Sequence, residues 1–257
     1  LLRESRGDDY IIIQSTTSTQ NSGLFDFLLP KFYGETGIQV RVVAVGTGQA
    51  LKNGRNGDGD VLLVHSTIDE EIFVAEGWGS YRKDVMYNEF VIVGPPEDPA
   101  SVRGIVNARN AFQRLADSGV IFLSRGDESG THKKEMALWT ALGLEPDRTG
   151  ALWYREAGAG MGATLNIAVE MRAYTLTDRG TWISFLNKND FEVLVADDPE
   201  LFNQYGVIPV DPKKHPSVRN KRAEIFVQWI TGPVGQKWIE EYRIDGRQLF
   251  FPNAAGG

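Results

Sequence analysis

Short apolar runs alternate along the chain with segments whose apolar residues recur at helical spacing. The runs Tyr10–Gln14, Ile38–Val45 and Asp60–Val64 are typical of buried strands. Further strands are expected at Glu89–Val93, Val120–Leu123, Trp153–Tyr154, Phe191–Val195 and Val207–Val210. Five helices are expected with both ends defined: Leu24–Gly34, His132–Leu142, Ala163–Arg172, Val218–Ile230 and Gly235–Tyr242. A further helix is expected to start at Gln49 and stop at Gly54, and another to carry the acids Asp69, Glu70 and Glu71 in its first turn. A last one is expected to begin at Asp178 with Thr177 as its cap.

Strands that alternate with helices predict an α/β fold with mainly parallel sheets flanked by helices. Two loops, Gly94–Pro99 and Asp197–Pro199, are the best candidates for places where the chain passes between two lobes. One lobe would hold residues 1–93 and 207–257, and the other would hold residues 94–206. A ligand cleft is expected between them.

Composition narrows the class of protein. The 257 residues are 42% apolar and 24% charged, which is ordinary for a globular protein. No apolar run approaches ~18 residues, so a membrane span is not expected. The net charge of −7 makes the chain a poor candidate for nucleic-acid binding. With no cysteine and three histidines, neither a disulfide nor a bound metal cation is expected, and no cofactor is implied.

The N-terminal segment Leu1–Asp9 carries charges and no apolar stretch, so no secretory signal peptide is expected within it. This is compatible with a cytosolic protein and equally with a mature form that has already been processed.

Polar loops that contain hydroxyl residues or glycines follow several expected strands and precede helices. They are Ser15–Thr19, Gly46–Gly48, His65–Thr67, Ser124–Thr131 and Gly158–Gly162. In open α/β sheets, ligands bind beyond the carboxyl ends of the strands. Helix N-termini there offer unpaired N–H groups to an anion. Ser and Thr are also ordinary N-caps and Gly an ordinary turn residue, so only the recurrence of such loops favours an anion site.

The loop Ser124–Thr131 is the most specific of these. Arg125 can bind two oxygens of an anion at once, and Asp127 could orient its guanidinium. Ser129, Gly130 and Thr131 would add hydroxyl and N–H donors at a helix start. The alternative is a surface loop with an Arg–Asp pair of little energetic value.

An enzyme is the alternative from another class. Residues Gly158–Ala163 fit the dinucleotide pattern G-x-G-x-x-A, and Asp178 lies near the spacing expected for a ribose carboxylate. Against this, no clear βαβ continuation follows the pattern. Ser129 and His132 do not form a hydrolase motif, and His65 and His215 are expected to be solvated or capping residues.

Several motifs together resemble the type II periplasmic solute-binding proteins of ABC importers, and among these the tungstate-binding proteins. The run Ser15–Thr19 resembles their Thr-Thr-Thr-Ser signature, with Ser15 in place of the first Thr. The segments Val45–Leu51, Asp60–His65, Met86–Gly94 and Ala173–Gly180 are similar to this family as well. The resemblance extends from about Ile11 to Tyr242, and Arg125–Thr131 also resembles the anion loop of phosphate-binding relatives.

The resemblance implies a non-enzymatic, two-lobed protein that closes on tungstate and delivers it to an ABC permease with its ATPase. It implies a periplasmic or otherwise extracytoplasmic location, compatible with a lipoprotein precursor, and a monomer. A signalling receptor of the same fold is a second alternative. The implied oxyanion ligands are Thr17, Ser18, Thr47, Ser66, Arg125, Ser129, Gly130, Thr131, Met161 and Gly162, with Asp127 orienting Arg125 and Tyr174 a candidate neighbour of the site.

The chemistry of the loops bears on the choice of anion. Phosphate keeps a proton near pH 7 and benefits from a carboxylate acceptor, whereas tungstate, molybdate and sulfate are unprotonated dianions that a carboxylate would repel. No Asp directly follows the strand Asp60–Val64, since Asp69 comes later, inside the next helix. The residues therefore favour an unprotonated dianion, while molybdate, sulfate and phosphate stay open as alternatives. Tungstate rather than molybdate rests on the resemblance alone.

Overall fold

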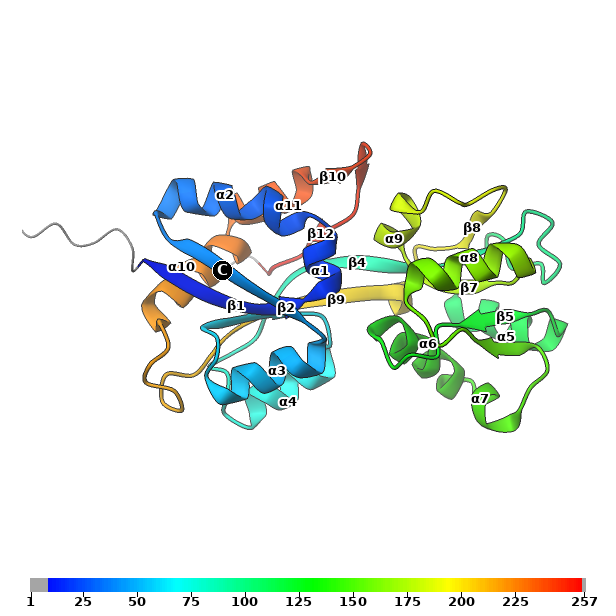
Figure 1. Cartoon of the computed structure of the whole chain (residues 1–257), viewed down its shortest axis with the longest axis horizontal. Helices are drawn as coiled ribbons and strands as arrows, with labels where there is room; N and C mark the ends of the chain where they lie inside the picture. Colours follow the sequence, from blue (N-terminus) through cyan, green and yellow to red (C-terminus); the bar gives the residue numbers. More distant parts are fainter. Residues whose placement is uncertain (1–8, 256–257) are drawn as a thin grey trace, which may run out of the picture. The chain divides into compact units, whose positions relative to one another are not determined.

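The structure is a computed structural model that describes residues 9–255 of the chain (Figure 1). The expectation about a signal peptide in Leu1–Asp9 concerns residues of which all but Asp9 lie outside this range. The chain forms two compact units. The first runs to Tyr87 and resumes at Gln204, and the second comprises Asn88–Asn203.

The first unit is built on a mixed sheet. Strand β1 (Tyr10–Thr16) pairs in parallel with β2 (Gln39–Val45) and β3 (Val61–Val64). Strand β9 (Phe202–Pro209) runs antiparallel to β3, and β12 (Phe251–Pro252) runs antiparallel to β4 (Lys83–Gly94). Because β1, β2 and β3 are parallel, their carboxyl ends meet at one edge of the sheet. A small hairpin joins β10 (Arg243–Ile244) to β11 (Arg247–Gln248).

Helices cover both faces of this sheet. Figure 1 shows α2 (Leu24–Thr36) and α11 (Pro233–Glu241) on one side of the strands and α3 (Thr47–Asn56) and α4 (Thr67–Ala75) on the other. Alternate residues of β3 serve the two layers. Val61 and Leu63 pack in the cluster with α2 and α10 (Asn220–Thr231), while Leu62 and Val64 pack with α3 and α4. Burial on both faces explains why β3 is a continuous apolar run. The short α1 (Thr17–Asn21) follows β1 directly.

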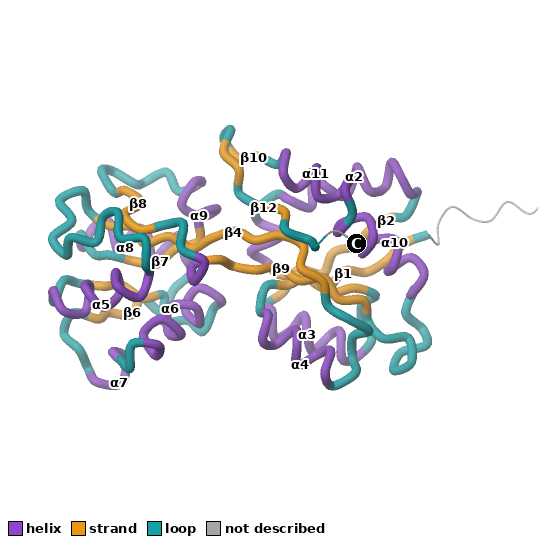
Figure 2. The backbone as a smooth tube through the Cα atoms, turned by 180° about the vertical axis from the view of Figure 1, so that it is seen from behind, coloured by secondary structure: helices purple, strands orange, loops and turns teal. Residues whose placement is uncertain are grey.

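The second unit has the same layered construction. The end of β4 pairs antiparallel with β7 (Thr175–Asp178) and β8 (Glu192–Val195), and β5 (Phe122–Ser124) pairs in parallel with β6 (Tyr154–Glu156). Phe90 and Ile92 pack toward α5 (Ala108–Ser118) and α6 (Gly130–Ala141), whereas Val91 and Val93 pack toward α8 (Met161–Met171) and α9 (Arg179–Ser184). Figure 2 shows α5, α6 and the short α7 (Pro146–Thr149) within this unit. A 3₁₀ turn, η1 (Pro199–Leu201), precedes β9.

The structure corrects two expected helix ends. Helix α3 continues through Gly54 and ends at Asn56, followed by Gly57 in the left-handed region at φ 78°. Gly54 serves close packing instead, since an added Cβ would lie 3.0 Å from atoms of Leu62. Helix α9 is capped by Asp178 and not by Thr177, because the Asp178 side chain accepts the N–H of Thr181.

The structure also differs from the expected strand directions and places where the chain changes lobe. Parallel pairing holds for β1–β3 and for β5 with β6, but β4 and β9 add antiparallel pairs in both units. The chain passes between the units inside β4 and inside β9, and the loops Gly94–Pro99 and Asp197–Pro199 both lie within the second unit. Val91 and Val93 belong to that unit because they pair with β7. Over residues 9–255, no helix is long and apolar enough to cross a membrane.

Candidate functional site

Three polar loops of the first unit meet at the carboxyl edge of its sheet. Thr16, the last residue of β1, stands opposite Val45, the last residue of β2. The Ser15 hydroxyl donates to the Leu63 carbonyl of β3 at 2.6 Å. Thr16 Oγ1 lies 3.2 Å from Nε2 of His65, which follows β3. The loops after β1, β2 and β3 therefore lie side by side, as their positions after parallel strands predict.

Only part of the hydroxyl run Ser15–Thr19 faces outward. Ser15, Thr16 and Thr19 are buried, and Thr16 caps α1 by accepting the Thr19 N–H at 3.2 Å. Thr17 and Ser18 are exposed, and no hydrogen bond to another described residue occupies their N–H groups. These two residues are thus the ones able to donate to an anion.

His65 joins this cluster although its sequence context predicted a solvated or capping role. Its Nε2 lies 3.2 Å from Ser18 Oγ as well as from Thr16 Oγ1. Its ring packs against Tyr205 with a centroid distance of 4.8 Å. His65 is a site-adjacent residue that the sequence missed, because only the register of β1 and β3 brings it to the hydroxyl run.

The loop after β2 presents a helix start with open space around it. Gly46 precedes α3 in an extended conformation, and Thr47 is half-buried. An added Cβ at Gly46 or Gly48 would meet nothing within 4 Å. Within the described chain, the N–H groups of Thr47 and Gly48 have no hydrogen-bond acceptor. The α3 N-terminus can therefore donate to an anion.

Ser66, expected to bind the anion, has both its donors engaged. Its hydroxyl donates to Asp69 Oδ2 at 2.6 Å and its N–H donates to Glu70 Oε1 at 2.7 Å. Burial raises the pKa of Glu70 to about 7, although the charge and hydrogen bond of Arg82 oppose the rise. Gly206 leaves room for the ion pair between Glu70 and Arg82, because an added Cβ would lie 2.0 Å from Glu70 Oε2.

In the second unit, Arg125 and Asp127 form the pair that the sequence predicted. A guanidinium nitrogen of Arg125 lies 2.5 Å from Asp127 Oδ2, and both side chains are largely buried, at 18% and 21% exposed. Burial opposes ionisation of Asp127, but hydrogen bonds from Ser129 and the charge of Arg125 outweigh it, so its pKa lies below the usual range. The Nε of Arg125 is buried without a hydrogen-bond partner among the described residues. The guanidinium is thus oriented from one side and has an unused donor.

The loop that holds this pair leads into α6. Ser129 caps the helix by accepting the His132 N–H at 3.3 Å, and its own N–H donates to Asp127 at 3.2 Å. Of the expected donors, Ser129 is therefore engaged, whereas the N–H groups of Gly130 and Thr131 have no acceptor in the described part of the chain.

The glycine loop before α8 lies beside the arginine loop. The Ala157 N–H donates to the Ser124 carbonyl at 2.9 Å, and the Ala159 N–H donates to the Arg125 carbonyl at 3.3 Å. Helix α8 begins at Met161, which is buried, and Gly162, which is exposed. These two neighbouring loops therefore carry the guanidinium of Arg125 and lead into the N-termini of α6 and α8.

Two further residues singled out from the sequence have other partners. The Tyr174 hydroxyl donates to Asp98 Oδ1 at 2.8 Å and accepts the Ala100 N–H at 3.0 Å, so it closes a loop of the second unit. Asp178 accepts both the N–H and the hydroxyl of Thr181 at 2.7 Å. Its carboxylate therefore acts as a helix cap.

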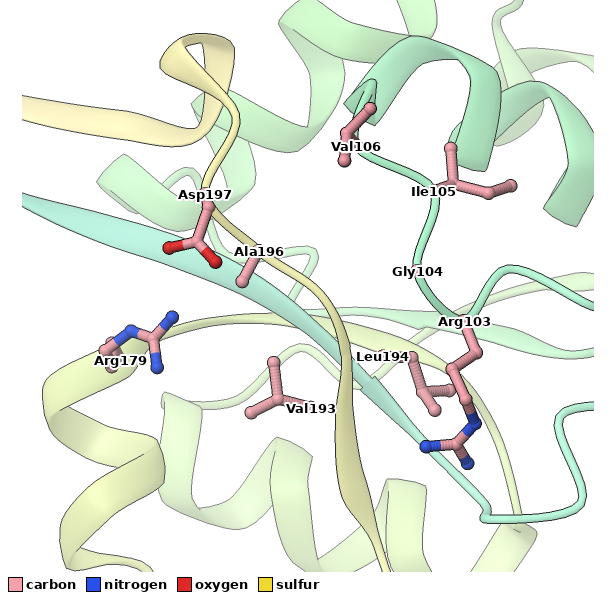
Figure 3. Close-up of a pocket in the computed structure, with 9 residues that line it drawn as sticks. All are labelled: Arg103, Gly104, Ile105, Val106, Arg179, Val193, Leu194, Ala196 and Asp197. Carbon is pink, nitrogen blue, oxygen red and sulfur yellow. The ribbon is translucent and has the colours of Figure 1, made fainter.

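A separate shallow pocket of about 440 Å³ lies between the loop after Arg103 and strand β8 (Figure 3). Arg179 and Asp197 line it together with apolar residues such as Val193. Arg179 is paired at 2.5 Å with the buried Glu89. None of the expected ligand residues lines this pocket. Nor do His, Asp and Glu side chains gather in threes anywhere in residues 9–255 so as to hold a metal ion.

Comparison with known proteins identifies the class to which this fold and these loops belong. A family model described as a PBP superfamily domain matches residues 4–234, so the chain belongs to the PBP superfamily. Within it, the chain belongs to the family of the tungstate-binding protein TupA. The TupA of Peptoclostridium acidaminophilum is 49% identical over 249 residues, which are 95% of this chain and 86% of that protein.

Solved structures agree with this assignment. The tungstate-binding protein TupA from Desulfovibrio alaskensis G20 is 45% identical, with a TM-score of 0.91 over 96% of this chain and 99% of that one. The crystal structure of the tungstate ABC transporter from Geobacter sulfurreducens is 48% identical, with a TM-score of 0.78 over 91% of this chain and 99% of that one. The chain is a solute-binding protein and not an enzyme, so the dinucleotide-dependent alternative is wrong.

Proposed function

We propose that this chain captures tungstate outside the cytoplasm, as a monomer, and delivers it to the permease of an ABC transporter. The observation that carries the proposal is the set of unengaged N–H groups at the starts of α1, α3, α6 and α8, together with one oriented arginine. Such neutral donors suit a small oxyanion. Tungstate is proposed as the ligand because this chain is 45% to 49% identical to three proteins of tungstate-binding systems.

The proposed ligand groups fall into two sets. The first unit contributes Thr17, Ser18 and Thr47, and the second contributes the guanidinium of Arg125 with donors of Gly130, Thr131, Met161 and Gly162. Asp127 orients Arg125 and the loop. Ser129 remains a prediction, with its N–H donating to Asp127 and its hydroxyl accepting the His132 N–H in this structure. Ser66 and Tyr174 remain predictions, with their polar groups engaged elsewhere in this structure.

The engaged carboxylates support an unprotonated dianion as the ligand. Asp127 accepts from Arg125, Asp69 accepts from Ser66, and Glu70 accepts from Arg82. Each of these carboxylates already has a donor within its own unit, which disfavours a further role as the acceptor for the proton of hydrogen phosphate. Sulfate and molybdate satisfy the same requirement as tungstate, so selectivity among the three has to be measured.

Calorimetric titration with tungstate, molybdate, sulfate and phosphate tests the proposal. We expect tight binding of tungstate, competition by molybdate, and affinities for sulfate and phosphate at least a hundredfold weaker. Phosphate or sulfate bound more tightly than tungstate would refute the proposed ligand. Elemental analysis of the purified protein provides a second readout, since retained tungsten would identify the ligand directly.

A further inference from the structure

Glu135 is a buried carboxylate on the helix that follows the arginine loop of the second unit. It lies on α6 and is 1% exposed. Its Oε1 accepts the Tyr154 hydroxyl at 2.8 Å and the Trp139 indole N–H at 3.1 Å. The nearby Ser124 hydroxyl acts to lower the pKa of this carboxyl. No Lys, Arg or His within residues 9–255 forms an ion pair with it. A buried acid held by neutral donors alone is costly to keep charged.

The partners of Glu135 connect it to both loops. Ser124 ends β5 immediately before Arg125, and its Oγ accepts the Gly126 N–H at 3.1 Å, which fixes the start of the arginine loop. Tyr154 begins β6, the strand that leads into the glycine loop before α8. Glu135 itself lies five residues after Gly130, the first residue of α6. Glu135 thus lies on the helix that begins with Gly130 and Thr131 and is bonded to the strand that leads into the glycine loop before α8.

We infer that Glu135 is a positioning residue that couples oxyanion binding to the uptake of a proton. A dianion bound at the N-termini of α6 and α8 repels a carboxylate ion on α6 and therefore favours the protonated carboxyl. The neutral carboxyl can still accept from Tyr154 and Trp139 and can donate its own hydrogen to Ser124 Oγ, so the loop start stays in place. By linkage, an anion that favours the protonated form binds more tightly as the pH falls.

Glu135 can change its charge near neutral pH. Burial raises its pKa to about 7, against the opposing hydrogen bonds of Ser124, Tyr154 and Trp139, and the charge of Glu156 on β6 adds to the rise. The adjoining elements carry further charged or titratable groups: His132, Lys133 and Lys134 on α6, Tyr154 and Arg155 on β6, Arg109, Arg114 and Asp117 on α5, Asp178 on β7, and the Arg125–Asp127 pair after β5. Lys134, the residue next to Glu135, donates to the Glu200 carbonyl at 3.0 Å. Substitution of Glu135 alone separates its contribution from those of these neighbouring groups.

Calorimetry in buffers of different ionisation enthalpy measures the protons taken up on binding. This test rests on the proposed function and uses the whole chain at pH 7.5 with tungstate. We expect the natural chain to take up about half a proton, as a rise of about one unit in the pKa of Glu135 implies. The affinity of the natural chain for tungstate should fall roughly tenfold between pH 6 and pH 8.5. Glu135→Gln should remove most of the proton uptake and should reduce this fall in affinity to about twofold. Glu170→Gln, an exposed charge-matched control on α8, should behave as the natural chain does.

Each outcome decides the inference. Tungstate binding without proton uptake in the natural chain would overturn it and leave the proposed function intact, whatever the variant does. Unchanged uptake in Glu135→Gln would assign the proton to another group and also overturn it. If molybdate or sulfate binds and tungstate does not, the proposed ligand fails and the same proton measurement on that anion decides the role of Glu135. If no oxyanion binds, both proposals fail.

Discussion

Replacing Arg125 with alanine perturbs the proposed site most strongly. The substitution removes the cation at this loop and leaves Asp127, which accepts from that guanidinium at 2.5 Å, without its counter-charge. Losing a hydrogen bond to a charged group costs about 1.5–3 kcal/mol. For a separation of about 6 Å between the bare carboxylate and the bound dianion, the repulsion amounts to about 2–3 kcal/mol at an effective dielectric constant of about 40. A combined loss of about 4 kcal/mol corresponds to roughly a thousandfold rise in Kd.

Calorimetric titration with tungstate measures this loss, and a second substitution separates its two parts. In Arg125→Ala combined with Asp127→Asn, the repulsive charge is gone, so about thirtyfold of the affinity should return. Arg109→Ala removes one exposed arginine that pairs with Glu200 on the surface, and it should leave the Kd unchanged. An Arg125→Ala protein that binds within tenfold of the natural chain would refute a direct role for Arg125. A double variant no better than the single one would refute the assigned role of Asp127.

Three further outcomes follow from the contacts. Ser18→Ala should weaken tungstate binding about tenfold, as expected for one lost donor to an anion, whereas Ser66→Ala should change the Kd by less than about threefold in the same titration. Gly206→Ala should lower the midpoint of thermal unfolding by several degrees because its Cβ would collide with a buried ion pair, while Gly34→Ala, with open space around it, should not. Burial raises the pKa of Glu135 to about 7, so the folded chain binds more protons than the unfolded chain up to that pH. The free energy of unfolding should therefore fall as the pH rises from 5.5 to 8, and Glu135→Gln should flatten this trend in thermal denaturation.

The sequence predicted elements whose signal is local. The strands β1 and β3 were visible as apolar runs because most of their residues are buried. The edge strand β2 was visible from its β-branched residues, although none of its residues is fully buried. Helix α5 was missed although its cues are local, since Asn107 caps its start and Gly119 follows its end at φ 68°. Its buried Ala108, Ala111, Phe112 and Leu115 also recur at helical spacing, so this helix could have been predicted from the sequence.

The candidate site was predicted only as far as loops and residue types go. The hydroxyl run Ser15–Thr19 was evident, but the side chains that face outward depend on how β1 turns into α1, which buries Thr16 and Thr19. The acids after Ser66 were expected to lie in the first turn of a helix. That two of them accept hydrogen bonds from Ser66 itself could not be predicted without the geometry of the turn. Glu135 resembles any other helical acid in the sequence. Only the packing of α6 against β5 and β6 reveals that it is buried.

The negative net charge of −7 and the proposed dianion ligand are compatible because the proposed donors do not rely on net charge. The one arginine at the loops is already matched by Asp127, so attraction must come from N–H dipoles and hydroxyls that cannot titrate. Surface charge is screened beyond about 8–10 Å at physiological salt and contributes little at the loops. Buried charges are screened much less by salt. Glu135 is such a buried group, lies on the helix that begins with Gly130 and Thr131, and has no ion-pair partner among the described residues. Because the proposed donors are neutral and cannot titrate, the inferred protonation of Glu135 is what makes the affinity for a dianion depend on pH.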